Sequence, residues 1–204
     1  NPYTYISKVQ LDKRFDSLDK RIDNLTDEQV KVALLEIIAT IGDSHTNAVI
    51  PAESLFPFSF SFFDDGVYVT LSGKEYSNCL GKKLTAIENM GIDQINRLML
   101  KIIPHENLSH FKALLTEYLV RPDILKGLGI TCSGETATFH FEGSANQPIS
   151  FSVPAIRSQD LGNYYRTMIP FIPARPLLSA EVKGRPYWFR VIANNTAMYL
   201  NYNR

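Results

Sequence analysis

The sequence predicts an α+β fold, because the spacing of its apolar residues changes along the chain. In the first fifty residues the apolar positions recur every three or four residues, as on one face of a helix. From Pro57 they alternate with polar residues, as in a strand with one buried face. We therefore expect an N-terminal helical unit (1–50), a mixed helix and strand unit (51–155), and an extended, strand-rich C-terminal segment (156–204).

Two amphipathic helices, arranged as a hairpin or small bundle, are predicted in the helical unit. The first carries an apolar face made of Leu11, Phe15, Leu18, Ile22 and Leu25. The second begins at a capping box, in which Thr26 is the N-cap and the Gln29 side chain reaches back to it. Gly42 is expected to end this helix, as glycine often does.

The rest of the chain contains one clear hairpin signal and several shorter elements. Asp64, Asp65 and Gly66 form a turn signal between two alternating runs, which predicts a β-hairpin. Helices are expected at 92–103, from Asn107 onward and at 122–128. Further strands are expected at 82–87, 130–132, 137–141, 149–153, 187–191 and 197–202. The range 157–186 holds four prolines and is expected to be an extended connection.

Composition excludes some classes of partner. The 21 Lys and Arg residues balance 21 Asp and Glu residues, so the charge gives no reason to expect nucleic acid or an anionic membrane surface. No apolar run approaches the roughly 20 residues that a transmembrane helix needs, and no signal peptide is recognised. Cys79 and Cys132 lie far apart without metal-ligand spacing, which predicts two buried thiols.

The stretch from Asp43 to Thr46 is the most informative for chemistry. It joins a helix to the next element and places His45 between two hydroxyl side chains, with a carboxylate two residues earlier. Neighbours of this kind can fix the tautomer of a histidine, as a general base requires. The same pattern is typical of an ordinary capped loop, so the residues alone leave both interpretations open.

The order of four stretches resembles the N-terminal half of the tail-specific (C-terminal processing, tricorn-like) serine peptidases. These stretches are 42–46, 56–58 with 65–69, 80–87, and 187–188 with 198–203. The resemblance implies that residues 51–155 form a PDZ-like unit. It also implies that this chain is the N-terminal part of such an enzyme, without the catalytic core, and is inactive alone.

The resemblance implies roles for two residues of the 42–46 stretch. In the tricorn-like branch, His45 would be the general base and Ser44 would orient or polarise it. The other branch uses a serine and a lysine that both lie in the core, and then His45 need not take part. The sequence leaves the choice between the two branches open.

The PDZ-like interpretation predicts a second site and an alternative function. Asp65, Gly66, Val67 and Tyr68 would bind the peptide substrate, in place of the usual carboxylate-binding loop. In the alternative, the chain is a non-catalytic PDZ-like module that binds peptides or proteins.

Peptides or unfolded proteins are therefore the expected partners. The resemblance implies no metal and no organic cofactor, and the spacing of His105, His110 and His140 also predicts no metal site. The resemblance favours an extracytoplasmic location, without fixing one. It predicts neither the identity of the substrate nor an oligomeric state.

Overall fold

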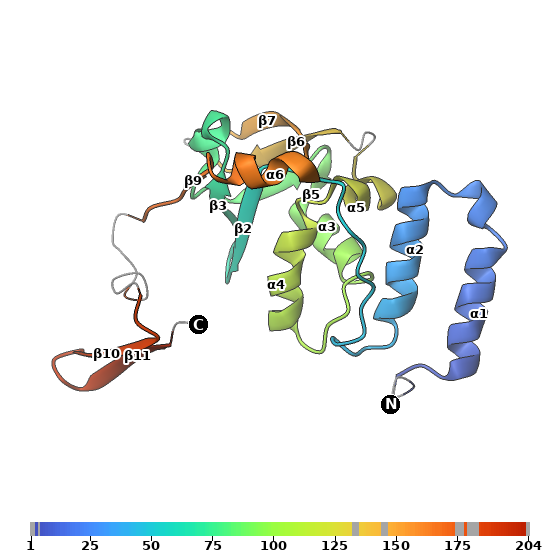
Figure 1. The fold of residues 1–204 in the computed structure, drawn as a ribbon, viewed down its shortest axis with the longest axis horizontal. Helices are drawn as coiled ribbons and strands as arrows, with labels where there is room; N and C mark the ends of the chain where they lie inside the picture. The colour runs from blue at the N-terminus through green and yellow to red at the C-terminus, as the bar shows by residue number, and fades with distance from the viewer. Residues whose placement is uncertain are drawn as a thin grey trace. The chain divides into compact units, whose positions relative to one another are not determined.

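The computed structural model describes residues 3, 5–131, 135–143, 147–173, 178 and 184–202 (Figure 1). Helices and antiparallel sheets occur together in one chain, which confirms the predicted α+β class. The chain divides into two compact units, Asn1–Phe171 and Ile172–Arg204. The predicted boundaries near residues 50 and 155 both fall inside the first unit, and the finer division stays a prediction.

The first unit begins with two helices that are each started by a capping box. Helix α1 (Lys8–Asp19) follows the N-cap Ser7, and α2 (Asp27–Ala39) follows Thr26, whose side chain accepts the Gln29 N–H as predicted. The short helix η1 (Ile22–Asn24) lies between them. Helix α2 ends three residues before Gly42, with Thr40 as its C-cap. The two helices contact each other around a small apolar cluster made of Leu18, Ala33 and Ile37.

Two larger antiparallel sheets and one short two-stranded pairing form the described strand portion of this unit. The first has the order β2-β3-β9, and the second has the order β5-β4-β6-β7. Their strands are β2 (Phe58–Phe63), β3 (Gly66–Ser72), β4 (Leu84–Ile87), β5 (Met90–Gly91), β6 (Thr136–Phe141), β7 (Ile149–Pro154) and β9 (Ile169–Pro170). The predicted hairpin is confirmed, because Phe63 pairs with Gly66 across a two-residue loop. The expected strand at 130–132 is wrong for Ile130 and Thr131, and Cys132 lies outside the described residues.

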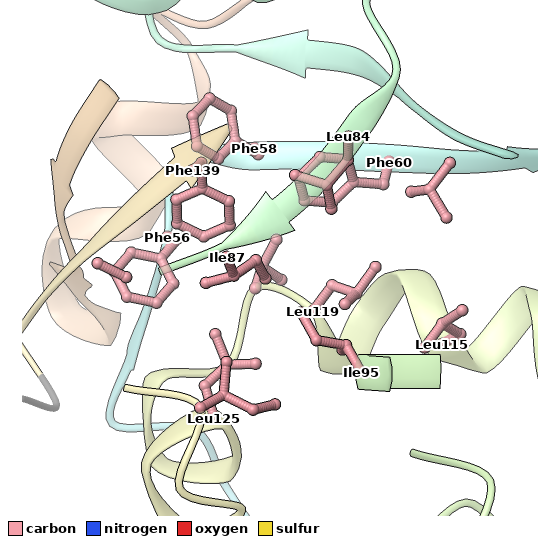
Figure 2. Close-up of a cluster of buried hydrophobic side chains, with 14 of the residues drawn as sticks. Phe56, Phe58, Phe60, Leu84, Ile87, Ile95, Leu115, Leu119, Leu125 and Phe139 are labelled. Atoms are coloured by element: carbon pink, nitrogen blue, oxygen red, sulfur yellow. The ribbon is translucent and has the colours of Figure 1, made fainter. Parts of the chain in front are cut away.

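The core lies between these sheets and the helices α3 (Ile92–Met99), α4 (Leu108–Tyr118) and α5 (Pro122–Gly127). Its centre is aromatic, and Figure 2 shows the side chains of Phe56, Phe58 and Phe139 gathered in one cluster. The Phe139 ring lies 5.1 Å from each of the other two rings, between centroids, in edge-to-face geometry. Such pairs stabilise a core beyond their burial. Cys79 is buried as predicted, and burial raises the pKa of its thiol to about 12.

Helix α5 packs against α2 and joins the helical region to the rest of the unit. The Lys126 ammonium lies 2.9 Å from Glu28 Oε1. This hydrogen bond is the main reason why the pKa of Glu28 falls from its ordinary value of 4.5 to about 2. Because the folded-state pKa is lowered, the pair adds stability above pH 4.5 and loses it as the pH falls toward 2.

Replacing Lys126 with methionine should therefore flatten the acid side of the stability profile. The urea midpoint of the wild type should fall more steeply between pH 4.5 and pH 2 than that of Lys126→Met. Lys8→Met is the matched control, since Lys8 pairs with Asp12 on the exposed face of α1. Parallel profiles for wild type and Lys126→Met would contradict this account of Glu28.

The described part of the range 157–186 contains a helix, so the prediction of an extended connection is wrong there. Helix α6 (Ser158–Tyr165) follows a short pairing of β1 (Ser54–Leu55) with β8 (Ile156–Arg157). None of its residues is buried, so no apolar periodicity marks it. The Tyr164 hydroxyl donates to the Glu75 carboxylate on η2 (Lys74–Cys79), and this contact helps to hold the helix in place.

The second unit is the predicted hairpin of β10 (Tyr187–Ile192) and β11 (Ala197–Tyr202). Three cross-strand pairs of large side chains lie on one face of it, and each of these side chains is at least 50% exposed. The pairs are Tyr187 with Tyr202, Phe189 with Leu200, and Val191 with Met198. Throughout the described parts of both units, we find no helix with the length and apolar character needed to cross a bilayer.

Candidate active site

The Asp43–Thr46 loop is closed by the Asp43 carboxylate. Its Oδ1 accepts the backbone N–H of His45 at 3.0 Å, and its Oδ2 accepts the Thr46 hydroxyl at 2.8 Å. This is the way an aspartate side chain stabilises a turn. These two hydrogen bonds, led by the backbone N–H of His45, lower the pKa of Asp43. The carboxylate is therefore ionised at neutral pH.

Both ends of the loop are attached to the body of the first unit. At its start Gly42 has φ +72°, and a Cβ there would lie 2.7 Å from the Tyr5 ring, so a larger residue would be strained and crowded. Beyond it, the Arg121 guanidinium donates to the Ile50 carbonyl at 2.9 Å. The same guanidinium makes two hydrogen bonds to Asp123. The chain is thus held by glycine geometry just before the loop and by an ion-paired arginine four residues after it.

A residue distant in sequence, Glu106, completes the group. The Ser44 hydroxyl donates to Glu106 Oε1 at 3.0 Å. Glu106 lies in the connection between α3 and α4. There His105 Nδ1 donates to the Ile103 carbonyl at 2.7 Å, and Asn107 caps α4. Nothing in the local sequence marks this glutamate, because tertiary folding alone brings it to the loop.

One side of the His45 ring faces these oxygen atoms. Its Nδ1 lies 3.5 Å from Asp43 Oδ1, 4.0 Å from Glu106 Oε1 and 3.4 Å from the Ser44 hydroxyl. Two nearby carboxylates favour a proton on Nδ1. The His45 side chain is 89% exposed, so Nε2, on the other side of the ring, is open to solvent. An imidazole held in this way can accept a proton at Nε2.

Ser44 is not placed to be the nucleophile for this histidine. Its hydroxyl lies on the Nδ1 side of the ring and donates to Glu106. A nucleophile activated by His45 would have to approach Nε2 from another direction. The loop therefore supplies a candidate base, His45, and the groups that orient it. The nucleophile on which this base would act must come from elsewhere.

The predicted substrate-binding residues form a different arrangement at the β2–β3 hairpin. The Tyr68 hydroxyl donates to Asp65 Oδ2 at 2.6 Å, which lowers the pKa of Asp65 and raises that of Tyr68. Both residues line a cavity of about 360 Å³, together with Phe63, Val69, Thr70, Gly81 and Phe171.

The other two predicted residues do not line this cavity. Val67 is 1% exposed and belongs to the core. Gly66 lies against the Lys83 side chain, and a Cβ there would meet Lys83 Cε at 2.3 Å. Substrate binding by these four residues stays a prediction, and the cavity shares no residue with the group around His45.

Comparison with solved structures gives a similarity in fold. The sequence matches no protein family and no curated protein. The fold is similar to that of mature CPAF in its complex with lactacystin, and CPAF is a chlamydial serine protease of tail-specific-like type. The TM-score is 0.50 at 13% identity, and the match covers 70% of this chain but only 28% of the CPAF chain. At this identity the similarity concerns the fold alone.

Proposed function

We propose that this chain is the N-terminal part of a serine peptidase and supplies its general base. In this proposal His45 accepts the proton of a serine hydroxyl that lies outside residues 1–204, and the reaction hydrolyses a peptide bond. The observation that carries the proposal is the orientation of His45. Its Nδ1 faces two carboxylates while the exposed ring leaves Nε2 free to act.

The proposed step conserves protons and bonds. The serine Oγ attacks the peptide carbonyl as its proton moves to His45 Nε2, and the protonated imidazole gives this proton to the leaving amine, which leaves an acyl-serine. Water then attacks the acyl group, its proton passes to Nε2, and the imidazole returns that proton to the serine as the acid product departs. Asp43 and Glu106 stabilise the imidazolium that forms in each of these two stages, since both carboxylates lie within 4.0 Å of Nδ1. A Ser-His arrangement uses both carboxylates in this way, whereas a Ser-Lys arrangement would leave Asp43 with only its role in closing the loop.

Two further observations support the proposal. The fold is similar to that of a serine protease, although the chain spans only 28% of that protein. In the second unit, three exposed cross-strand pairs leave an apolar hairpin face that a further part of the protein can cover. Extended apolar strand pairs without cover favour association. We propose that the region carrying the serine packs on this face.

Glu106→Gln in the intact protein tests the proposal through a residue that the sequence did not indicate. For hydrolysis of an unstructured protein substrate, kcat should fall on the order of ten- to a hundredfold. The reason is that removing the charge of one carboxylate weakens the electrostatic stabilisation of the protonated His45 ring. KM should change little, because Glu106 touches no substrate in this mechanism. Glu117→Gln on α4 is the matched control. Equal kcat values for Glu106→Gln and wild type would remove Glu106 from the mechanism.

Peptide binding without catalysis is the second candidate function. Among the described strands β2 pairs on one side only, and α4 contacts this strand. The Lys112 ammonium on α4 lies 4.6 Å from the centroid of the Phe62 ring on β2. A free strand edge beside a helix can accept an extended peptide. An intact protein that binds such peptides but never cleaves them would favour this function.

A further inference from the structure

Three metal-ligand side chains from two distant parts of the chain meet at one point of the surface. Asp43 and His45 belong to the loop after α2, and Glu106 comes from the connection between α3 and α4. One donor atom from each lies within 4.8 Å of the other two. We propose that these three residues bind a divalent cation of the Zn²⁺ type, and that the bound cation inhibits the site.

The separations between the donor atoms are close to those of a zinc site. Zinc binds imidazole nitrogen and carboxylate oxygen at about 2.0–2.2 Å, so two ligands of a tetrahedral ion lie about 3.4 Å apart. His45 Nδ1 lies 3.5 Å from Asp43 Oδ1 and 4.0 Å from Glu106 Oε1. The Glu106 side chain is 53% exposed. Since all three donor atoms lie within 4.8 Å of one another, rotation of that exposed side chain toward the other two would complete three ligands and leave the fourth position to water.

Neighbouring groups already orient the two carboxylates by hydrogen bonds, as is usual for carboxylates that bind a metal. The Ser44 hydroxyl donates to Glu106, while the Thr46 hydroxyl and the His45 N–H donate to the two oxygens of Asp43. Hydrogen bonds of this kind orient coordinating carboxylates. Each carboxylate oxygen has two lone pairs, so one is still available to a cation. Two carboxylates and a neutral imidazole carry two negative charges, which a divalent ion balances.

The donor set also selects the ion. One imidazole and two carboxylates suit Zn²⁺ and its first-row neighbours, whereas Mg²⁺ and Ca²⁺ prefer oxygen ligands alone and more of them. The sequence predicted no metal because its histidines show no ligand spacing, and Glu106 is 61 residues from His45. The inhibitory effect rests on the proposed function. A cation bound through the Nδ1 lone pair leaves the single proton of the neutral imidazole on Nε2, where it prevents transfer of the serine proton. The binding itself does not depend on that function.

Isothermal titration of the intact protein with zinc chloride, in a buffer that does not bind metal, tests the site. One zinc ion should bind per chain. Glu106→Gln and Asp43→Asn should each weaken binding about tenfold or more, and His45→Ala at least as much. The control His140→Gln should bind as the wild type does, because His140 hydrogen-bonds Ser150 outside the cluster. Melting temperatures should confirm that each variant is folded.

The outcomes separate the metal site from the peptidase proposal. No zinc binding by the wild type, or equal affinity in wild type, Glu106→Gln and His45→Ala, would overturn the site. Zinc binding through these residues in a protein without peptidase activity would establish the site and remove the proposed function. In an active protein, saturating zinc should stop hydrolysis and a chelator should restore it. Full activity with zinc bound would overturn the inhibitory effect.

Discussion

Replacing His45 with alanine is expected to lower kcat of the intact protein by a factor of about a thousand or more, the scale on which removal of a triad-type base acts. The reason is that the two carboxylates described beside it cannot take its place, since Asp43 and Glu106 lie on the Nδ1 side of the ring. The assay follows hydrolysis of an unstructured protein substrate. KM should stay within a few fold, because the base acts only in the reaction step.

Two controls make this result specific. The His45 side chain is 89% exposed, so His45→Ala should melt at the wild-type temperature and the lost activity would not reflect unfolding. His140→Ala removes a histidine from β6 and should retain full activity. Normal hydrolysis by His45→Ala would exclude it as the base and move the chemistry to a Ser-Lys arrangement elsewhere in the protein.

Replacing Phe139 with alanine is expected to reduce the free energy of unfolding by about 3–5 kcal/mol. Phe139 has no exposed surface, and its ring contacts Phe56 and Phe58 at 5.1 Å between centroids. The smaller side chain leaves a cavity that the rigid rings of Phe56 and Phe58 cannot close. Urea unfolding, read as a shift of the midpoint at constant slope, measures the loss.

The matched control for Phe139 lies on the adjacent strand. Ser152 pairs with Thr138 across β6 and β7 and is exposed, so Ser152→Ala should change stability by no more than about 0.5 kcal/mol. A loss below about 1 kcal/mol for Phe139→Ala would mean that the aromatic cluster is not the centre of the core.

Local signals predicted much of the fold. The capping box at Thr26 and Gln29 and the turn at Asp64–Gly66 act over a few residues, and both are present in the structure. Helix α6 was missed because all its residues remain at least partly exposed and its attachment depends on a distant carboxylate, Glu75. The helix predicted at 92–103 is present as α3, but it ends at Met99, four residues before the predicted end.

The candidate site shows the same division between local and distant information. Asp43, Ser44 and His45 lie in one short polar stretch after a helix, which is recognisable in sequence, but only the family resemblance implied catalytic roles for Ser44 and His45. Glu106 could not be recognised in sequence, since its role comes from a hydrogen bond to Ser44 across 62 positions. The second carboxylate of the site, on which the proposed metal affinity depends, is brought to the 43–46 loop only by folding of the α3–α4 connection.

The most direct measurement is to label the intact protein with a fluorophosphonate, which reacts with an activated serine hydroxyl, and to locate the labelled residue by peptide mapping. The account predicts one labelled serine, outside residues 1–204, and a labelling rate that falls about a thousandfold or more in His45→Ala. No labelled serine in the wild type, or a labelling rate that is unchanged in His45→Ala, would contradict His45 as the general base of a serine peptidase.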